Sequence, residues 1–312
     1  AGKAADLPLY RLLGGKVRDR VRVYISGTRN GLDTSYAHTP EGAAKNLAEA
    51  VNDPAGFTIV KSGIGFHSPM PFEVPDFFYG EPRPGPPHLN RGLLTDKGFR
   101  HCVECVESMV EAIDGKAQLA LDCGPGWALS DAIRFAKEME RYPILWLEDL
   151  LTGDRSNHVG AAEYKELTQS TTTPIHTGEQ IYLRHGFREL IETRAVRVIG
   201  PDPMDVGGLA ELKWIAEYAD MHGILIAPHG VFNGVLGLAA LVQVCATLPD
   251  NLIAFEYCKP PTDWWWDIVD GMPDQIVVEG HINVCDSPGI GVTLNEEKTK
   301  QYLSAEDQDF FD

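Results

Sequence analysis

The chain has 312 residues, and its 45 Asp and Glu against 27 Lys and Arg give a formal net charge of −18 at pH 7, which argues against nucleic acid as a partner. Hydrophobic residues make up 44% of the chain and charged residues 23%, a balance that excludes a disordered chain and a coiled coil. No run approaches the ~18 apolar residues of a membrane span, and the first residues lack the apolar core of a signal peptide. We therefore expect a cytoplasmic protein without a membrane partner.

Two short apolar runs, Val21–Ser26 and Phe57–Lys61, are the first strand patterns along the chain. The stretch 64–96 that follows them holds seven prolines and several aromatic residues. It is too long for an ordinary strand-to-helix connection, and its prolines disfavour a regular helix. An inserted loop at this point would lie at the carboxyl ends of the strands, where it could cover a site.

From about residue 117, short apolar runs that end in a polar residue alternate with helical patterns. The runs are Gln118–Asp122, Ile144–Glu148, Ile175–Glu179, Val196–Asp202, Ile224–His229 and Ile253–Glu256. Such runs predict parallel strands that are buried on both faces. With the two earlier strands they make eight strand–helix units, the number in an α/β fold of the (β/α)8 TIM-barrel type. A doubly wound open sheet is the alternative, but no GxGxxG motif follows the early strands.

The polar residues that end the six later strands lie 26, 31, 23, 27 and 27 residues apart, about one strand–helix unit each. In a parallel barrel they would meet at one mouth, where ionisable groups need partners or a metal ion. Three of them, Asp122, Glu148 and Glu179, are carboxylates on consecutive strands. Crowded carboxylates without thiolate or imidazole favour Mg²⁺ over Zn²⁺.

The remaining strand ends carry groups suited to proton transfer. Asp202 and His229 follow on the next two strands, and a carboxylate beside an imidazole fixes its tautomer and raises its basicity, as a general base requires. Glu256 ends the last strand; if it is protonated beside the other carboxylates, it would donate a hydrogen bond to a developing oxyanion.

Several short motifs, in this order and spacing, match a known family. They are Leu147–Asp149, Thr177–Gln180, Pro201–Gly208, Ala227–Gly230 and Phe255–Tyr257. Together they resemble the enolase superfamily, in particular the mandelate racemase/muconate lactonizing enzyme branch with its acid-sugar dehydratases. The resemblance implies that Asp122, Glu148 and Glu179 bind one Mg²⁺ per subunit. It further implies that Asp202 and His229 form the base dyad and that Glu256 hydrogen-bonds the substrate carboxylate or enediolate.

Two positions depart from the pattern of this branch. Its members usually carry Lys-x-Lys at the end of the second strand, and the second lysine is a base on the opposite face of the substrate. Here Lys61 is present but Gly63 replaces the second lysine, which disfavours a two-base racemase. Some dehydratases also place His or Asn two residues after the first metal ligand, where this chain has Gly124. The acid that expels hydroxide therefore stays open.

The candidates for that acid are His229 itself, Lys61, and His67 or Tyr79 in the loop. Their positions in the sequence do not distinguish between them.

The resemblance also predicts the domain organisation. Residues 1–15 resemble the segment that leads into the barrel, so we expect the N-terminal α+β capping domain of the family to be largely missing. Residues 16–262 would form the barrel, with the inserted loop at 64–96. Residues 263–312, with three consecutive tryptophans at 264–266, would form a short C-terminal tail outside the eight barrel strands that packs on the barrel or cap.

We therefore expect a Mg²⁺-dependent hydro-lyase that dehydrates a sugar acid. His229 would remove the α-proton, Lys61 and Glu256 would help to stabilise the enediolate, and loss of the β-hydroxyl would give a 2-keto-3-deoxy acid. We also expect a homo-oligomer. An epimerase or cycloisomerase of the same branch is the second hypothesis. A catalytically inactive barrel that serves as a binding or assembly module is an alternative of another class.

Overall fold

The computed structural model describes residues 1–26, 38–83, 92–151, 160–230, 234–259 and 264–311. Residues 84–91 of the predicted insertion, and the predicted domain boundary between residues 262 and 263, lie outside the described residues.

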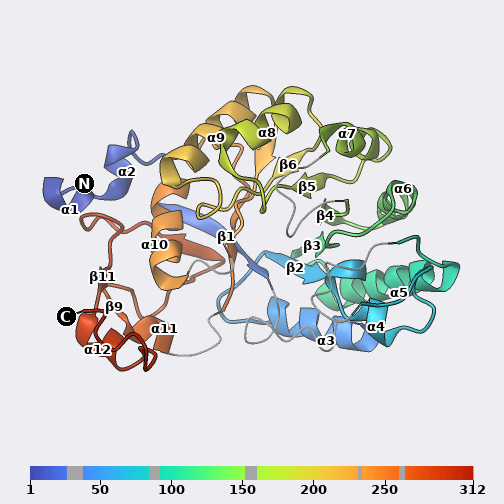
Figure 1. The fold of residues 1–312 in the computed structure, drawn as a ribbon, viewed down its shortest axis with the longest axis horizontal. Helices are drawn as coiled ribbons and strands as arrows, with labels where there is room; N and C mark the ends of the chain where they lie inside the picture. The colour runs from blue at the N-terminus through green and yellow to red at the C-terminus, as the bar shows by residue number, and fades with distance from the viewer. Residues whose placement is uncertain (27–37, 84–91, 152–159, 231–233, 260–263, 312) are drawn as a thin grey trace.

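Eight parallel strands form a curled sheet (Figure 1). They are β1 (Arg20–Ser26), β2 (Ile59–Gly63), β3 (Gln118–Asp122), β4 (Ile144–Glu148), β5 (Ile175–Thr177), β6 (Val198–Ile199), β7 (Leu225–Ile226) and β8 (Phe255–Tyr257). Each strand from β1 to β6 pairs with the next one, and β8 pairs with β1. The Ile253 N–H donates to the Ile226 carbonyl at 2.9 Å, so the approach to β8 lies beside β7. The fold is α/β and TIM-barrel-like, as predicted.

Three of the strands, β5, β6 and β7, end before the polar residue that closes the corresponding apolar run. Gly178 directly follows β5, and Pro201 and Pro228 lie two residues beyond β6 and β7; the Pro228 carbonyl still accepts a hydrogen bond from the Glu256 N–H at 2.9 Å. Gly178 has φ +131°, and a Cβ there would lie 2.8 Å from the Phe187 ring. Proline has no N–H to donate. The residues beyond these points therefore extend into the mouth of the barrel.

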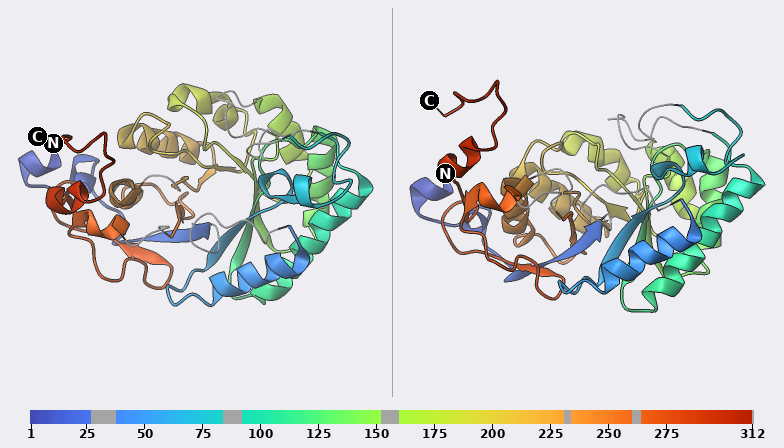
Figure 2. Two further views of the ribbon diagram at one scale, coloured as in Figure 1. Left: turned by 60° about the horizontal axis from the view of Figure 1, so that its bottom comes forward. Right: turned by 90° about the horizontal axis from the view of Figure 1, so that it is seen from below.

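Most of the helices lie around the outside of the sheet (Figures 1 and 2). The helices are α1 (Gly2–Ala5), α2 (Leu9–Leu12), α3 (Pro40–Val51), the 3₁₀ turn η1 (Gly65–His67), α4 (Met70–Glu73), α5 (Asp96–Ile113), α6 (Leu129–Met139), α7 (Ala161–Gln169), α8 (Leu183–Glu192), α9 (Leu209–Met221), α10 (Gly234–Cys245), α11 (Trp264–Asp267) and α12 (Glu296–Lys300). Among the described residues, no helix combines the length and the apolar character that crossing a membrane requires.

A separate layer of apolar side chains fills the inside of the curled sheet. It consists of Tyr24, Ile59, Ala120, Trp146, Val198, Ala227 and Ala254. Side chains alternate between the two faces of a strand, so the residue two places further on points to the same inner side. Two places after Ile59, Ala120, Trp146, Ala227 and Ala254 stand Lys61, Asp122, Glu148, His229 and Glu256. This alternation places the functional candidates directly above the packed inner layer.

The C-terminal segment adds three short strands, β9 (Val269–Asp270), β10 (His281–Asn283) and β11 (Thr293–Leu294). β11 pairs with β9, whereas β10 pairs antiparallel with the first half of β1. The predicted tail thus lies outside the eight parallel strands, but one of its strands hydrogen-bonds to the barrel. The first residues of the chain lie on the same side of the barrel (Figure 2), where the Leu9 N–H donates to the Gly289 carbonyl at 2.7 Å.

Candidate active site

The three predicted metal ligands converge at the mouth of the barrel. Asp122 and Glu148 end β3 and β4, and Glu179 lies two residues beyond β5. Each offers one carboxylate oxygen within 4.8 Å of the other two, and their exposed fractions are only 6%, 0% and 8%. Burial, together with the negative charge of Asp149, raises the pKa of Glu179 well above its usual range, although the positive charge of His229 acts in the opposite direction. A cation at this point would keep all three carboxylates ionised.

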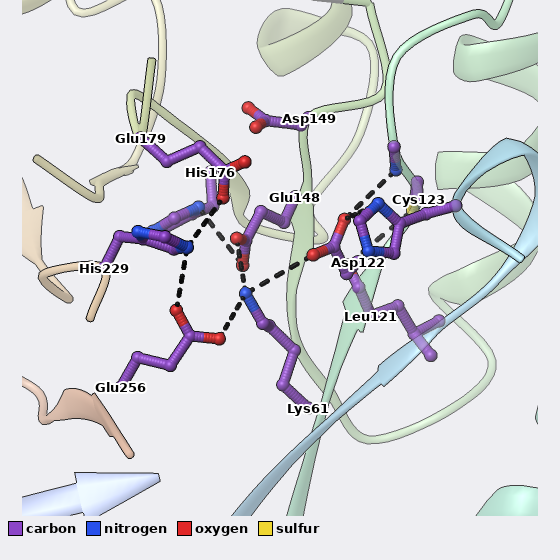
Figure 3. Close-up of polar contacts among 12 residues, drawn as sticks. Lys61, Leu121, Asp122, Cys123, Glu148, Asp149, His176, Glu179, His229 and Glu256 are labelled. Atoms are coloured by element: carbon purple, nitrogen blue, oxygen red, sulfur yellow. Dashed lines mark hydrogen bonds and ion pairs between the residues drawn. The ribbon is translucent and has the colours of Figure 1, made fainter. Parts of the chain in front are cut away.

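Lys61 on β2 reaches into the same cluster, as Figure 3 shows. Its ammonium lies 2.7 Å from Glu148 Oε1, 2.9 Å from Glu256 Oε1 and 3.4 Å from Asp122 Oδ2. Burial alone would lower the pKa of Lys61, but the charges of Glu148 and Glu256 outweigh it and raise this pKa well above its usual value. The lysine therefore remains a fixed positive charge at the centre of the site.

Asp202 and His229 form the predicted pair. Each lies three residues beyond its strand, β6 or β7, and the His229 Nδ1–H donates to Asp202 Oδ2 at 2.7 Å. The Met204 N–H donates to the other carboxylate oxygen at 2.7 Å and fixes the carboxylate plane. The second ring nitrogen, Nε2, faces Glu179 Oε2 at 3.6 Å and Glu256 Oε2 at 3.4 Å.

The surroundings of His229 favour its protonated form. Burial would lower the pKa of His229, but the charges of Glu179 and Glu256 and the bond to Asp202 raise it well above its usual value. The dyad thus orients the imidazole and stabilises the imidazolium that forms when it takes up a proton, as the role of a general base requires.

The sequence-based hypothesis of a protonated Glu256 is wrong. Although burial would raise the pKa of Glu256, the charges of Lys61 and His229 and a hydrogen bond from Ser26 lower it to about 2. The carboxylate is therefore an acceptor that holds Lys61. Of these two residues, only Lys61 has a proton to donate to an oxyanion. The periodic pattern of the strands could not reveal this pairing, because Lys61 and Glu256 lie on different strands far apart in the chain.

The predicted insertion begins at the site itself. The η1 turn follows β2 directly, and His67 Nδ1 in this turn lies 3.3 Å from Asp122 Oδ1. Tyr79, the other loop residue considered as an acid, is 71% exposed, and its backbone N–H donates to the Leu93 carbonyl.

Two residues that support Glu148 were missed in the sequence. The Trp146 indole N–H donates to Glu148 Oε2 at 2.9 Å, and His176 Nδ1 lies 3.5 Å from the same oxygen. The two rings stack with centroids 5.3 Å apart, and burial lowers the pKa of His176. Trp146 lies two residues before Glu148, so the alternation along β4 was the available signal. Figure 3 shows His176 beside Glu148, whereas the Asp149 carboxylate lies apart from the cluster.

Comparison with known proteins identifies the family of this chain. The model of the enolase C-terminal domain-like family matches residues 43–298. The chain belongs to this family. The resemblance inferred from the sequence motifs is thereby confirmed.

Two named relatives and one solved structure each match almost the whole chain. The chain is 36% identical over 312 residues to a D-xylonate dehydratase of Haloferax volcanii, a match that covers 100% of this chain and 68% of that protein. It is 28% identical over 307 residues to a D-mannonate dehydratase of Caulobacter sp. K31, covering 96% of this chain and 70% of the relative. Among solved structures, a mandelate racemase/muconate lactonizing enzyme-like protein from Rubrobacter xylanophilus superposes with a TM-score of 0.81 at 31% identity, over 98% of this chain and 74% of the other.

Proposed function

We propose that this chain is a Mg²⁺-dependent dehydratase that removes water from a sugar acid. The observation that carries the proposal is the convergence of three buried carboxylates with Lys61 and with the Asp202–His229 pair at one barrel mouth. The dehydratase names of two relatives support the sugar-acid class of substrate.

The donor set fits Mg²⁺. Asp122, Glu148 and Glu179 would hold the ion, because a hard cation takes carboxylate oxygens and the cluster brings one oxygen from each within reach of a shared position. The ammonium of Lys61 faces three carboxylates, Asp122, Glu148 and Glu256, and this excess of negative charge favours a divalent cation. When bound, Mg²⁺ would act as a Lewis acid that makes the proton α to a carboxylate more acidic.

His229 is the proposed base. Asp202 holds Nδ1–H, so Nε2 is the nitrogen that faces the site and takes the α-proton. Its position beyond β7 places it across the ring of strands from Asp122 on β3. A substrate at the mouth would therefore meet its base on the β7 side.

Lys61 is the proposed electrostatic stabiliser of the enediolate that forms. Its side chain is 2% exposed, and its ammonium is held by Glu148 and Glu256 at 2.7 and 2.9 Å. A fixed charge in a buried site needs no reorganisation as negative charge develops on the substrate. Departure of the β-hydroxyl then leaves an enol that becomes a 2-keto-3-deoxy acid.

The test is a panel of sugar acids that includes D-xylonate and D-mannonate, with 2-keto acid formation as the readout. We expect turnover of at least one acid with Mg²⁺, no turnover after removal of the metal with EDTA, and recovery when Mg²⁺ is added back. The variant Glu179→Gln should bind Mg²⁺ more weakly by calorimetry.

Other outcomes would replace the proposal. Epimer formation without water loss would favour an isomerase. Failure to bind Mg²⁺ together with a lack of turnover would favour a binding or assembly module.

A further inference from the structure

His67 occupies a defined place at the mouth of the barrel. Its backbone N–H donates to the Ile64 and Cys123 carbonyls at 3.2 and 3.1 Å, which ties the η1 turn to the end of β3. Its Nδ1 lies 3.3 Å from Asp122 Oδ1, and the side chain remains 30% exposed. The ring is therefore positioned by the fold and still accessible to a molecule bound at the mouth.

Two glycines make room for this histidine. A Cβ at Gly63 would lie 2.6 Å from the His67 carbonyl oxygen, and a Cβ at Gly124 would lie 2.5 Å from the His67 Cβ. Real side chains do not approach this closely, so any other residue at either position would displace the turn. Gly124 also has φ +58°, in the left-handed region that favours glycine. The end of β2 and the segment after β3 are thus both shaped around His67.

His67 and His229 lie on opposite sides of the site. His67 contacts Asp122 at the end of β3, whereas His229 follows β7, four strands further around the ring of eight. Figure 3 shows Asp122 and His229 on opposite sides of the Lys61 ammonium. A substrate held over Lys61 would therefore lie between two imidazoles.

The other acids considered from the sequence are less well placed. Lys61 is 2% exposed and its ammonium is shared among three carboxylates, whereas Tyr79 is 71% exposed at the protein surface. His229 carries the α-proton after the first step, on the side of the site away from Asp122. His67 combines accessibility with a fixed position near the proposed metal ligands.

We infer that His67 is the catalytic acid that protonates the departing β-hydroxyl, an inference that rests on the proposed dehydratase function. His229 takes the α-proton, and the electron pair of that C–H bond moves into the carboxylate to form the enediolate. The pair returns to form the C2–C3 double bond as the C3–O bond breaks. The oxygen leaves with the electrons of the C3–O bond, takes a proton from Nε2 of His67 and departs as water.

Both histidines return to their starting states in the last step. C3 of the enol takes the proton from His229, and the enol hydroxyl gives its proton to His67 as the 2-keto acid forms. The net change is loss of one water, with no oxidant or further reactant required.

The experiment compares leaving groups in wild type, His67→Gln and His67→Ala. On a sugar acid that wild type dehydrates, both variants should lose ~10²–10⁴-fold in water elimination, the usual contribution of an acid–base group. Exchange of the α-proton with D₂O should continue near the wild-type rate, because His229 is intact. With the 3-deoxy-3-fluoro analogue, the variants should regain most of the lost rate, since fluoride leaves without a proton. Mg²⁺ affinity, measured by calorimetry, should stay near wild type.

His222→Gln is the matched control, because His222 hydrogen-bonds the Tyr218 carbonyl at the end of α9, away from the mouth. The inference is overturned if His67→Gln dehydrates the natural substrate like wild type. An equal loss with hydroxyl and fluoride leaving groups, or a loss of Mg²⁺ affinity as large as in Asp122→Asn, would also overturn it. If wild type forms no 2-keto acid from any sugar acid, the proposed function is refuted, and this inference, which rests on it, is refuted as well.

Discussion

Replacing Lys61 with methionine should destabilise the metal-free protein by about 3–5 kcal/mol, the usual cost of removing one partner from a buried ion pair. The Lys61 ammonium lies 2.7–3.4 Å from three carboxylates, and its side chain is 2% exposed. Methionine keeps the length of the apolar stem beneath the charge, so the loss is electrostatic. At roughly 2–4 °C per kcal/mol, Tm should fall by about 6–20 °C.

The loss should depend on pH in a defined direction. In wild type, Lys61 and His229 hold the pKa of Glu256 at about 2, so its stabilising effect is present above the unfolded pKa and is lost only as pH falls toward 2. In Lys61→Met, burial without the ammonium raises the pKa of Glu256 instead. The loss of stability caused by the buried Glu256 charge is therefore greatest at neutral pH and becomes smaller as the carboxylate takes up a proton. The difference between variant and wild type should therefore shrink from pH 7 to pH 4.

Thermal unfolding in EDTA measures this effect, and addition of Mg²⁺ should restore part of the stability through binding to the folded state. Lys97→Met is the control: its ammonium lies 3.7 Å from Asp76 with the side chain 56% exposed, and such a pair is worth at most ~1 kcal/mol. If Lys61→Met in EDTA at neutral pH melts within about 2 °C of wild type, less than 1 kcal/mol by the same conversion, the charge-balance argument is refuted.

Three further predictions concern the dyad and the opposite face. His229→Asn should lower kcat by ~10²–10⁴-fold or more with Mg²⁺ affinity retained by calorimetry, because the imidazole is a base and not a ligand; turnover near wild type would assign the base elsewhere. Asp202→Asn should lower kcat by a smaller factor than His229→Asn. The kcat/KM profile should fall on the acid side through the raised pKa of His229, because only the neutral imidazole accepts a proton; Asp202→Asn should move this limb to lower pH, and an unmoved limb would contradict the assignment. With Gly63 in place of a second base, recovered substrate in D₂O should carry deuterium in one α-configuration only, and label in both epimers would disprove a one-base enzyme.

The strand alternation predicted which side chains share the mouth, but not which of them touch. Asp122 and Glu148 could be placed from the sequence because each ends an apolar run whose inner residues alternate with period two. The protonation state of Glu256 could not be predicted from the sequence, because its pKa depends on Lys61. The lysine comes from another strand and contacts Glu256 only in the folded barrel. His67 follows no periodic pattern.

The position of His67 depends on close backbone packing. Gly63 and Gly124 leave the space for the turn, and the carbonyl of Cys123 accepts its N–H. Such packing between separate loops has no signature in the hydrophobic pattern of either one, so the sequence could offer His67 only as one candidate among several.

The division of β1 between partners bears on how this protein folds. Arg20–Arg22 pair with β10, some 260 residues later, and Val23–Ile25 pair with β8, about 230 residues later, while only Ile25 and Ser26 pair with the nearby β2. During synthesis, most of β1 therefore stays unpaired until β8 and β10 have been made. Contacts between residues so distant along the chain form slowly, because loop closure must precede them. An open strand edge is also a template for association with other chains. Chains truncated before residue 253 would keep this edge open, and we expect them to aggregate rather than to yield a smaller folded barrel.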